Sequence, residues 1–210
     1  DGLDGSIARM TNKTSDVGRE LDSLADVITF GIAPAGLVFV WGVLFVVGPG
    51  DGVVESHLAR AGYLVSFFYL LCGAVRLARF NVQTNPMPKN PGRPDRKYFV
   101  GLPIPAGAGF IATVVYMDAA PVRSFLFSVF WLIVIVIVSL LMVSTWRYPS
   151  GKEITLTGRH PFQLLVLIGA AVSVLLLFSQ VLLLVIALGY MFSGLVARAA
   201  YTWTSRHRRI

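Results

Sequence analysis

Charged residues and cysteine are both scarce in this sequence of 210 residues. Asp, Glu, Lys and Arg make up only 14% of the chain and hydrophobic residues 55%, whereas water-soluble domains average about 25% charged residues. This composition argues against an ordinary water-soluble enzyme, a nucleic-acid-binding domain and a disordered tail. The single cysteine, Cys72, excludes an internal disulfide and a zinc site built from several cysteines. Because the chain is so apolar, its formal net charge of +7 indicates basic residues beside a membrane rather than a nucleic-acid-binding surface.

Long apolar runs dominate the chain, and they predict an all-α polytopic membrane protein with six transmembrane helices. The six runs are 27–47, 61–75 with an extension over 52–60, 102–117, 125–143, 162–178 and 181–196. Some runs are shorter than the roughly 20 residues that span a bilayer, so polar ends must extend them. Pro34 predicts a kink in the first run, and Ser179 with Gln180 predicts a tight turn between the last two.

Lys and Arg are absent from every second connection between these runs. The connections without them are 48–52, 118–121 and 179–180. The other connections contain Lys89, Arg93, Arg96, Lys97, Arg147, Lys152 and Arg159. Because cytoplasmic loops carry an excess of Lys and Arg, the sequence places residues 1–20 and the basic loop 83–100 in the cytoplasm. A simpler role for the basic loops is that they set the topology and touch lipid headgroups.

Acidic residues are few, yet more than half of the 11 lie in the first 26 positions. They are Asp1, Asp4, Asp16, Glu20, Asp22 and Asp26. On helices, Asp22 and Asp26 would share a face, and carboxylates at a membrane boundary are costly unless something compensates them. A divalent cation that prefers oxygen ligands, such as Mg²⁺, Mn²⁺ or Ca²⁺, would do so, and four carboxylates suffice for two ions that clamp a phosphoryl group. The alternative, helix-capping and solvated acids, explains Glu20 but not the pair at the start of the chain.

The same segment carries a longer pattern. Asp1-Gly-Leu-Asp4-Gly5-Ser-Ile-Ala8-Arg9 is followed by Gly18, and then at four-residue steps by Asp22 and Asp26. This pattern resembles the signature of the CDP-alcohol phosphotransferase family at every fixed position. The stretches 22–35, 76–82 and 98–105 resemble the phosphatidylserine synthase branch of that family, and this resemblance covers about residues 1–110.

The resemblance implies a metal and nucleotide site within residues 1–26 of a single domain that covers 1–210. In this family four aspartates bind two divalent cations, Mg²⁺ or Mn²⁺, and the last aspartate is the catalytic base, which would be Asp26. The expected metal ligands are Asp1, Asp4, Asp22 and Asp26. The expected nucleotide- and phosphate-binding residues are Gly5, Ala8, Arg9 and Gly18. Because the family has further helices before the signature, we expect this chain to lack one or two N-terminal helices of the full-length protein.

The implied reaction is transfer of a phosphatidyl group from CDP-diacylglycerol to L-serine, giving phosphatidylserine and CMP. Such a transferase would lie in a membrane, expected to be a bacterial inner membrane, with its active site on the cytoplasmic side. Membrane lipids and a second copy in a homodimer are its expected partners, and nucleic acid is not. The serine carboxylate would need a positively charged side chain as its partner, and we expect this side chain near the end of the second run. The candidates for the acceptor site are Arg76, Arg79, Asn81, Arg96 and Lys97.

Arg76 is flanked by apolar residues, so we expect it to face the bundle interior. Arg96 and Lys97 are as well explained by contacts to lipid headgroups. Two other functions stay open at this point. The first keeps the family and changes the acceptor to glycerol 3-phosphate or an inositol phosphate. The second is an ion-binding transporter, which predicts acidic residues deep in several runs. Only Asp26 approaches such a position, and this disfavours a transporter.

Overall fold

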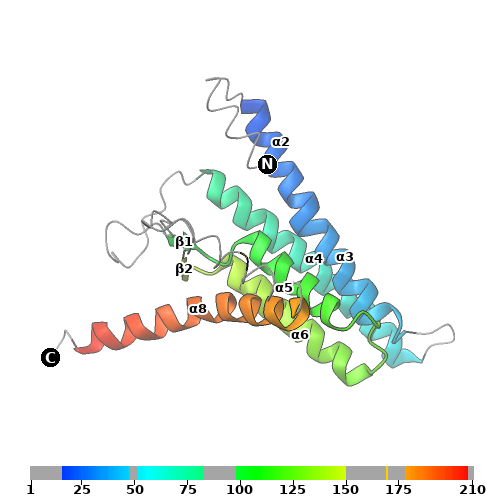
Figure 1. Cartoon of the computed structure of the whole chain (residues 1–210). Helices are drawn as coiled ribbons and strands as arrows, with labels where there is room; N and C mark the ends of the chain where they lie inside the picture. Colours follow the sequence, from blue (N-terminus) through cyan, green and yellow to red (C-terminus); the bar gives the residue numbers. More distant parts are fainter. Residues whose placement is uncertain (1–15, 48–51, 83–97, 150–168, 170–177, 208–210) are drawn as a thin grey trace.

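The structure, a computed structural model, describes residues 16–47, 52–82, 98–149, 169 and 178–207. Its elements are α2 (Asp16–Val27), η1 (Ile28–Ile32), α3 (Ala33–Phe39), η2 (Val40–Leu44), α4 (Val53–Val82), β1 (Tyr98–Val100), α5 (Ile104–Met117), α6 (Phe125–Val143), β2 (Arg147–Pro149) and α8 (Ser179–His207). Figure 1 shows α4, α5 and α6 gathered in a bundle, with α2 through η2 along one side and α8 across another. The described chain is therefore almost entirely helical.

The first rod of the bundle is continuous from α2 to η2, with two wider π-helical turns, η1 and η2. The first of these turns directly precedes α3, in which Pro34 lies in the first turn. A proline has no N–H and its ring clashes with the carbonyl four residues earlier, so a locally widened helix accommodates it. The irregularity predicted at Pro34 is thus present as a π-helical turn within an unbroken rod.

The core lies where α6 packs against α4 and against the α3–η2 part of the first rod. Two side chains of α6 donate hydrogen bonds to carbonyl oxygens of that rod: Ser128 Oγ to Gly42, and the Trp131 indole N–H to Val38 at 3.3 Å. A Cβ atom at Gly42 would overlap the Trp131 indole. The absence of a side chain at Gly42 is therefore what lets α6 approach so closely, as small residues do in membrane helix packing.

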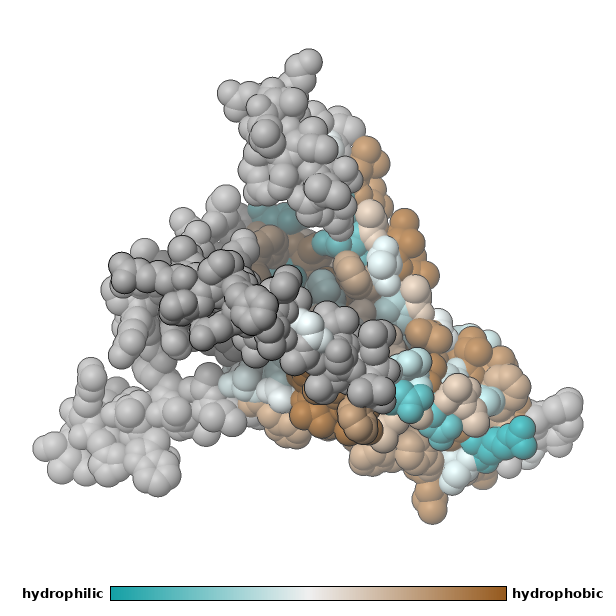
Figure 2. All heavy atoms as spheres, in the orientation of Figure 1, coloured by the Kyte–Doolittle hydropathy of each residue, from teal (hydrophilic) through white to brown (hydrophobic). Residues whose placement is uncertain are grey.

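Among the described residues, three helices are long and apolar enough to cross a membrane: Leu21–Leu44, Ser56–Asn81 and Phe125–Val143. The segments Ile104–Met117 and Ser179–Gly194 are shorter apolar helices. Apolar side chains are exposed along α2 and η1, among them Leu21, Leu24 and Ile28, and Figure 2 shows this apolar surface running along that edge of the molecule. These features are those of a membrane protein. The six-helix count stays a prediction, since most of the run 162–178 lies outside the described residues.

Two short strands depart from the predicted all-helical chain. β1 and β2 pair antiparallel, with Phe99 opposite Tyr148. The pairing continues directly after β1, where the Gly101 N–H donates to the Trp146 carbonyl at 2.7 Å. Gly101 has a φ of +79°, which a residue with a side chain rarely adopts. A second correction concerns Ser179 and Gln180, which form the first turn of α8 rather than a separate tight turn.

Candidate active site

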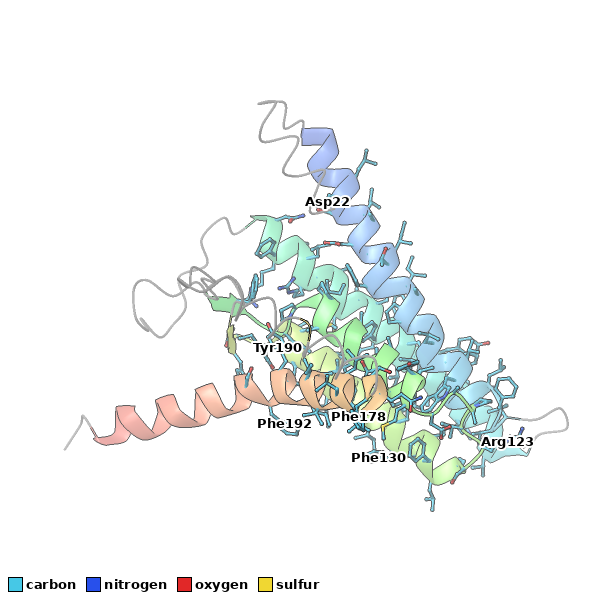
Figure 3. The ribbon with its side chains drawn as sticks, in the orientation of Figure 1. Asp22, Arg123, Phe130, Phe178, Tyr190 and Phe192 are labelled. Carbon is cyan, nitrogen blue, oxygen red and sulfur yellow. The ribbon has the colours of Figure 1, made fainter. Side chains whose placement is uncertain are left out.

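The two described acids of the signature lie one helical turn apart on α2. Asp22 is exposed and Asp26 is partly buried, and each carboxylate lies within the electrostatic range of the other. Figure 3 shows Asp22 beside the C-terminal end of α4 and Arg123 at the opposite end of the molecule. The acids thus lie at the end of the bundle where α4 and α6 finish (Figure 3).

Arg76 of α4 is a cation within electrostatic range of Asp26. Its side chain is only 8% exposed, as its apolar flanks predict, and its charge interacts with that of Asp26. The guanidinium carbon also lies 5.6 Å from the centre of the Phe80 ring. A buried charge without a partner is strongly destabilising. The opposite charge of Asp26 and the face of Phe80 together account for the burial of Arg76.

Arg79 and Asn81 follow Arg76 on α4, and each contacts a different helix. Arg79 Nη1 donates to the Val143 carbonyl at the end of α6, at 3.3 Å. The Asn81 amide donates to the Ser23 hydroxyl of α2, at 2.8 Å. Their observed partners are protein groups, so an additional role toward an acceptor stays a prediction for both.

Two tyrosines that the sequence analysis did not single out join this cluster. Tyr190 of α8 lies within electrostatic range of Arg76, and its ring packs at 5.7 Å from the ring of Tyr148 in β2. Tyr148 is fully buried, and its hydroxyl has no hydrogen-bond partner within the described part of the chain. Burial, with a smaller contribution from Tyr190, raises the pKa of Tyr148 to about 12. No local pattern marked either residue, because their proximity depends on how α8 crosses the bundle.

Of the remaining predicted site residues, one is described by the structure and the others lie outside the described residues. Gly18 lies on α2 four residues before Asp22 and is exposed, so it shares the face of Asp22. The others lie outside the described residues: Asp1, Asp4, Gly5, Ala8, Arg9, Arg96 and Lys97.

Among the described residues, no group of three or more His, Cys, Asp or Glu side chains could hold a metal ion. Asp22 and Asp26 nevertheless fit such a role as part of a larger set. They are oxygen donors on one helix face, and their mutual repulsion is relieved by a divalent cation. The two carboxylates therefore fit half of the predicted four-aspartate site.

The sequence profile of the CDP-alcohol phosphatidyltransferases matches residues 1–127 of this chain, which include Asp22, Asp26 and Arg76. The chain belongs to this family. Family membership confirms the resemblance that the signature predicted. The match ends within α6, so Tyr148 and Tyr190 lie beyond it.

Three relatives in the family are named CDP-diacylglycerol–serine O-phosphatidyltransferase. The protein from Helicobacter pylori is 38% identical over 159 residues, which cover 73% of this chain and 57% of the relative. That from Methanocaldococcus jannaschii is 36% identical over 150 residues, covering 71% and 58%. That from Bacillus subtilis is 33% identical over 153 residues, covering 73% and 70%. The chain thus spans a little over half the length of the first two relatives.

Proposed function

We propose that this protein is a CDP-diacylglycerol–serine O-phosphatidyltransferase, which transfers a phosphatidyl group to L-serine and releases CMP. The observation that carries the proposal is the placement of the acids Asp22 and Asp26 opposite the buried Arg76, at one end of an apolar helical bundle. Family membership supports the phosphotransfer chemistry, and the names of the relatives support serine as the acceptor.

Asp22 and Asp26 would hold divalent cations together with Asp1 and Asp4. When bound, two such cations, Mg²⁺ or Mn²⁺, would neutralise the negative charge of the pyrophosphate and of the departing CMP. The protein's contribution is to hold the carboxylates on a helix rather than on a loop, because a rigid element keeps ligands at a fixed separation. Gly5, Ala8, Arg9 and Gly18 are the proposed nucleotide-binding residues, and the guanidinium of Arg9 suits a phosphate.

Asp26 is the proposed base. The serine hydroxyl oxygen would form a bond to the phosphorus that carries diacylglycerol, the bond from that phosphorus to CMP would break, and the hydroxyl proton would pass to an Asp26 oxygen. A hydroxyl is a weak nucleophile at neutral pH, so a carboxylate held in position assists as the new bond forms. Asp26 is partly buried and lies within electrostatic range of the cation Arg76, and both features favour a restricted orientation of its carboxylate.

Arg76 is the proposed partner of the serine carboxylate. It is buried in the bundle close to Asp26, so an acceptor bound to it would place its hydroxyl near the proposed base. A guanidinium can hold a carboxylate through two parallel hydrogen bonds. Arg79 and Lys97 complete the set of proposed acceptor-binding residues, whereas the side-chain amide of Asn81, also expected there from the sequence, donates to Ser23 of α2.

The membrane setting suits this chemistry. CDP-diacylglycerol keeps its acyl chains in the bilayer and its pyrophosphate at the interface, and Asp22 and Asp26 lie near one end of the apolar segment Leu21–Leu44. We propose the cytoplasmic face of a bacterial inner membrane as the site of the reaction, from the distribution of Lys and Arg in the connections. Six membrane-spanning helices and a homodimer also stay proposals.

An acceptor panel tests the assignment directly. CMP release from CDP-diacylglycerol is measured in lipid vesicles with L-serine, glycerol 3-phosphate or inositol phosphate as the acceptor. The proposal expects CMP release that depends on serine, with little release for the phosphorylated alcohols. Release that depends on one of those alcohols and not on serine would overturn serine as the acceptor and retain the family chemistry.

A further inference from the structure

The last turn of α4 connects two neighbouring helices through two different side chains. Arg79 reaches the end of α6 and Asn81 reaches α2, at donor–acceptor distances of 3.3 and 2.8 Å. Residues two apart on a helix point about 200° away from each other, which explains how a single turn serves both sides. The link to α2 is the one that bears on the acidic pair.

Ser23, the acceptor of the Asn81 hydrogen bond, lies between the two acids. It directly follows Asp22 and precedes Asp26 by three residues, so it lies close to the face that carries both carboxylates. Within the part of the chain that the structure describes, this part of α2 packs little on its other sides, because Leu21 is 60% and Leu24 is 58% exposed. Figure 1 shows the N-terminal part of α2 continuing beyond the end of α4.

Because α2 continues into the packed α3–η2 part of the rod, only its N-terminal turns, which have few packing partners among the described residues, can twist relative to α4. Such a twist would carry Asp22 sideways relative to Asp26, whereas a metal site needs its ligands held within about 0.5 Å. The hydrogen bond from Asn81 opposes that motion, since Asn81 is the last but one residue of the 30-residue α4, which packs extensively on α6.

We propose that Asn81 is a positioning residue, whose hydrogen bond to Ser23 fixes the rotation of α2 and so keeps Asp22 and Asp26 in register as metal ligands. This inference rests on the proposed function, because the role of the two acids comes from it. Direct binding of the acceptor by Asn81 would instead predict that Asn81→Ala raises the serine KM at saturating Mg²⁺.

Kinetics separate the two roles. For Asn81→Ala we expect the Mg²⁺ concentration for half-maximal CMP release to rise about three- to tenfold, the effect of one hydrogen bond. The serine KM at saturating Mg²⁺ should stay within about twofold of the wild-type value. Ser23→Ala should also raise this concentration, and adding Asn81→Ala to Ser23→Ala should have no further effect, because the Asn81–Ser23 hydrogen bond is already absent.

Gln180→Ala is the matched control. It removes another side-chain amide hydrogen bond, from Gln180 to the Tyr116 carbonyl at the opposite end of the bundle, and should leave the Mg²⁺ dependence unchanged. A raised serine KM at saturating Mg²⁺ in Asn81→Ala, or additive effects of the Asn81 and Ser23 substitutions, would overturn the proposal.

A distance measurement tests the link without relying on turnover. Spin labels on cysteines at Leu24 and Ala78, both exposed, report the α2–α4 separation in protein carrying Cys72→Ala. We expect Asn81→Ala and Ser23→Ala to broaden the distance distribution and Gln180→Ala to leave it unchanged. An unchanged distribution in Asn81→Ala would overturn the proposal whatever the kinetics show. If wild-type turnover proves independent of divalent cations, the proposed function fails, and the distance measurement alone then decides the role of Asn81.

Discussion

At the scale of single residues, the site depends on opposite charges held close together in an apolar protein. Asp26 and Arg76 lie within electrostatic range of each other, one partly buried and the other 8% exposed. Each reduces the cost of burying the other. The same pair supplies a proposed base and a proposed carboxylate-binding group, so changes at the two positions should have distinct kinetic effects.

Asp26→Asn keeps the shape of the side chain and removes the base. We expect kcat for serine-dependent CMP release to fall by at least about 100-fold, the lower range for general base catalysis. The matched control is Asp118→Asn, at the opposite end of the bundle, where the carboxylate accepts a hydrogen bond from the Ala120 N–H. Both variants should retain the wild-type elution profile in detergent. A well-folded Asp26→Asn protein with normal kcat would remove Asp26 from the mechanism.

Arg76→Ala should act mainly on the acceptor. Loss of a charged hydrogen-bond donor is worth about 1.5–3 kcal/mol, so the serine KM is expected to rise about 10- to 100-fold, and the KM for CDP-diacylglycerol much less. Initial rates at varied serine and fixed, saturating lipid substrate measure the effect. Arg123→Ala, exposed at the opposite end (Figure 3), is the control and should match the wild type. Equal increases in both KM values would argue against a specific acceptor role.

Tyr148 provides a prediction about pH and stability. Its pKa is raised to about 12 in the folded protein, whereas an exposed tyrosine has a pKa of about 10. The neutral phenol therefore stabilises the fold fully below pH about 10, and this contribution is lost as the pH rises through about 12. Thermal unfolding of Tyr148→Phe should be close to wild type at neutral pH, because the hydroxyl has no partner within the described residues. Above pH 10 the wild type should lose stability faster than Tyr148→Phe; parallel pH profiles would contradict the burial of the phenol.

At the scale of the elements, close approach between α6 and the first rod holds the bundle together. Gly42→Ala would place a methyl group on the Trp131 indole and is expected to destabilise the protein by about 1–3 kcal/mol. Gly36→Ala is the matched change in the same rod, where nothing lies within 4 Å of the added atom. Thermal unfolding in detergent should show a lower Tm for Gly42→Ala and an unchanged or slightly higher Tm for Gly36→Ala. Equal shifts would show that the Trp131 contact does not limit the packing.

The sequence predicts elements better than it predicts contacts between them. Apolar runs identify the helices, and the apolar flanks of Arg76 correctly predict its burial. The hydrogen bonds of Arg79 and Asn81 were not predictable, because they depend on which helices end beside the last turn of α4. The β1–β2 pairing was missed because three-residue strands carry no periodic pattern, and the two strands lie far apart in the sequence.

At the scale of the whole molecule, one end of an apolar bundle concentrates the polar chemistry. α2 contributes the acids, α4 the arginine and α8 a tyrosine, so three elements far apart in the sequence form one cluster. Family membership followed from the signature in residues 1–26, which is a local pattern and therefore readable from sequence. The part played by α8 lies beyond that signature and required the structure.

The central claim is that Asp22 and Asp26 belong to a set of carboxylates that holds divalent cations for phosphatidyl transfer. Its most direct test is serine-dependent CMP release after exhaustive chelation, followed by stepwise addition of Mg²⁺ or Mn²⁺. We predict that chelation abolishes release, that either cation restores it in the wild type, and that Asp22→Asn requires far more cation for the same rate. Undiminished CMP release by the fully chelated protein would contradict the claim.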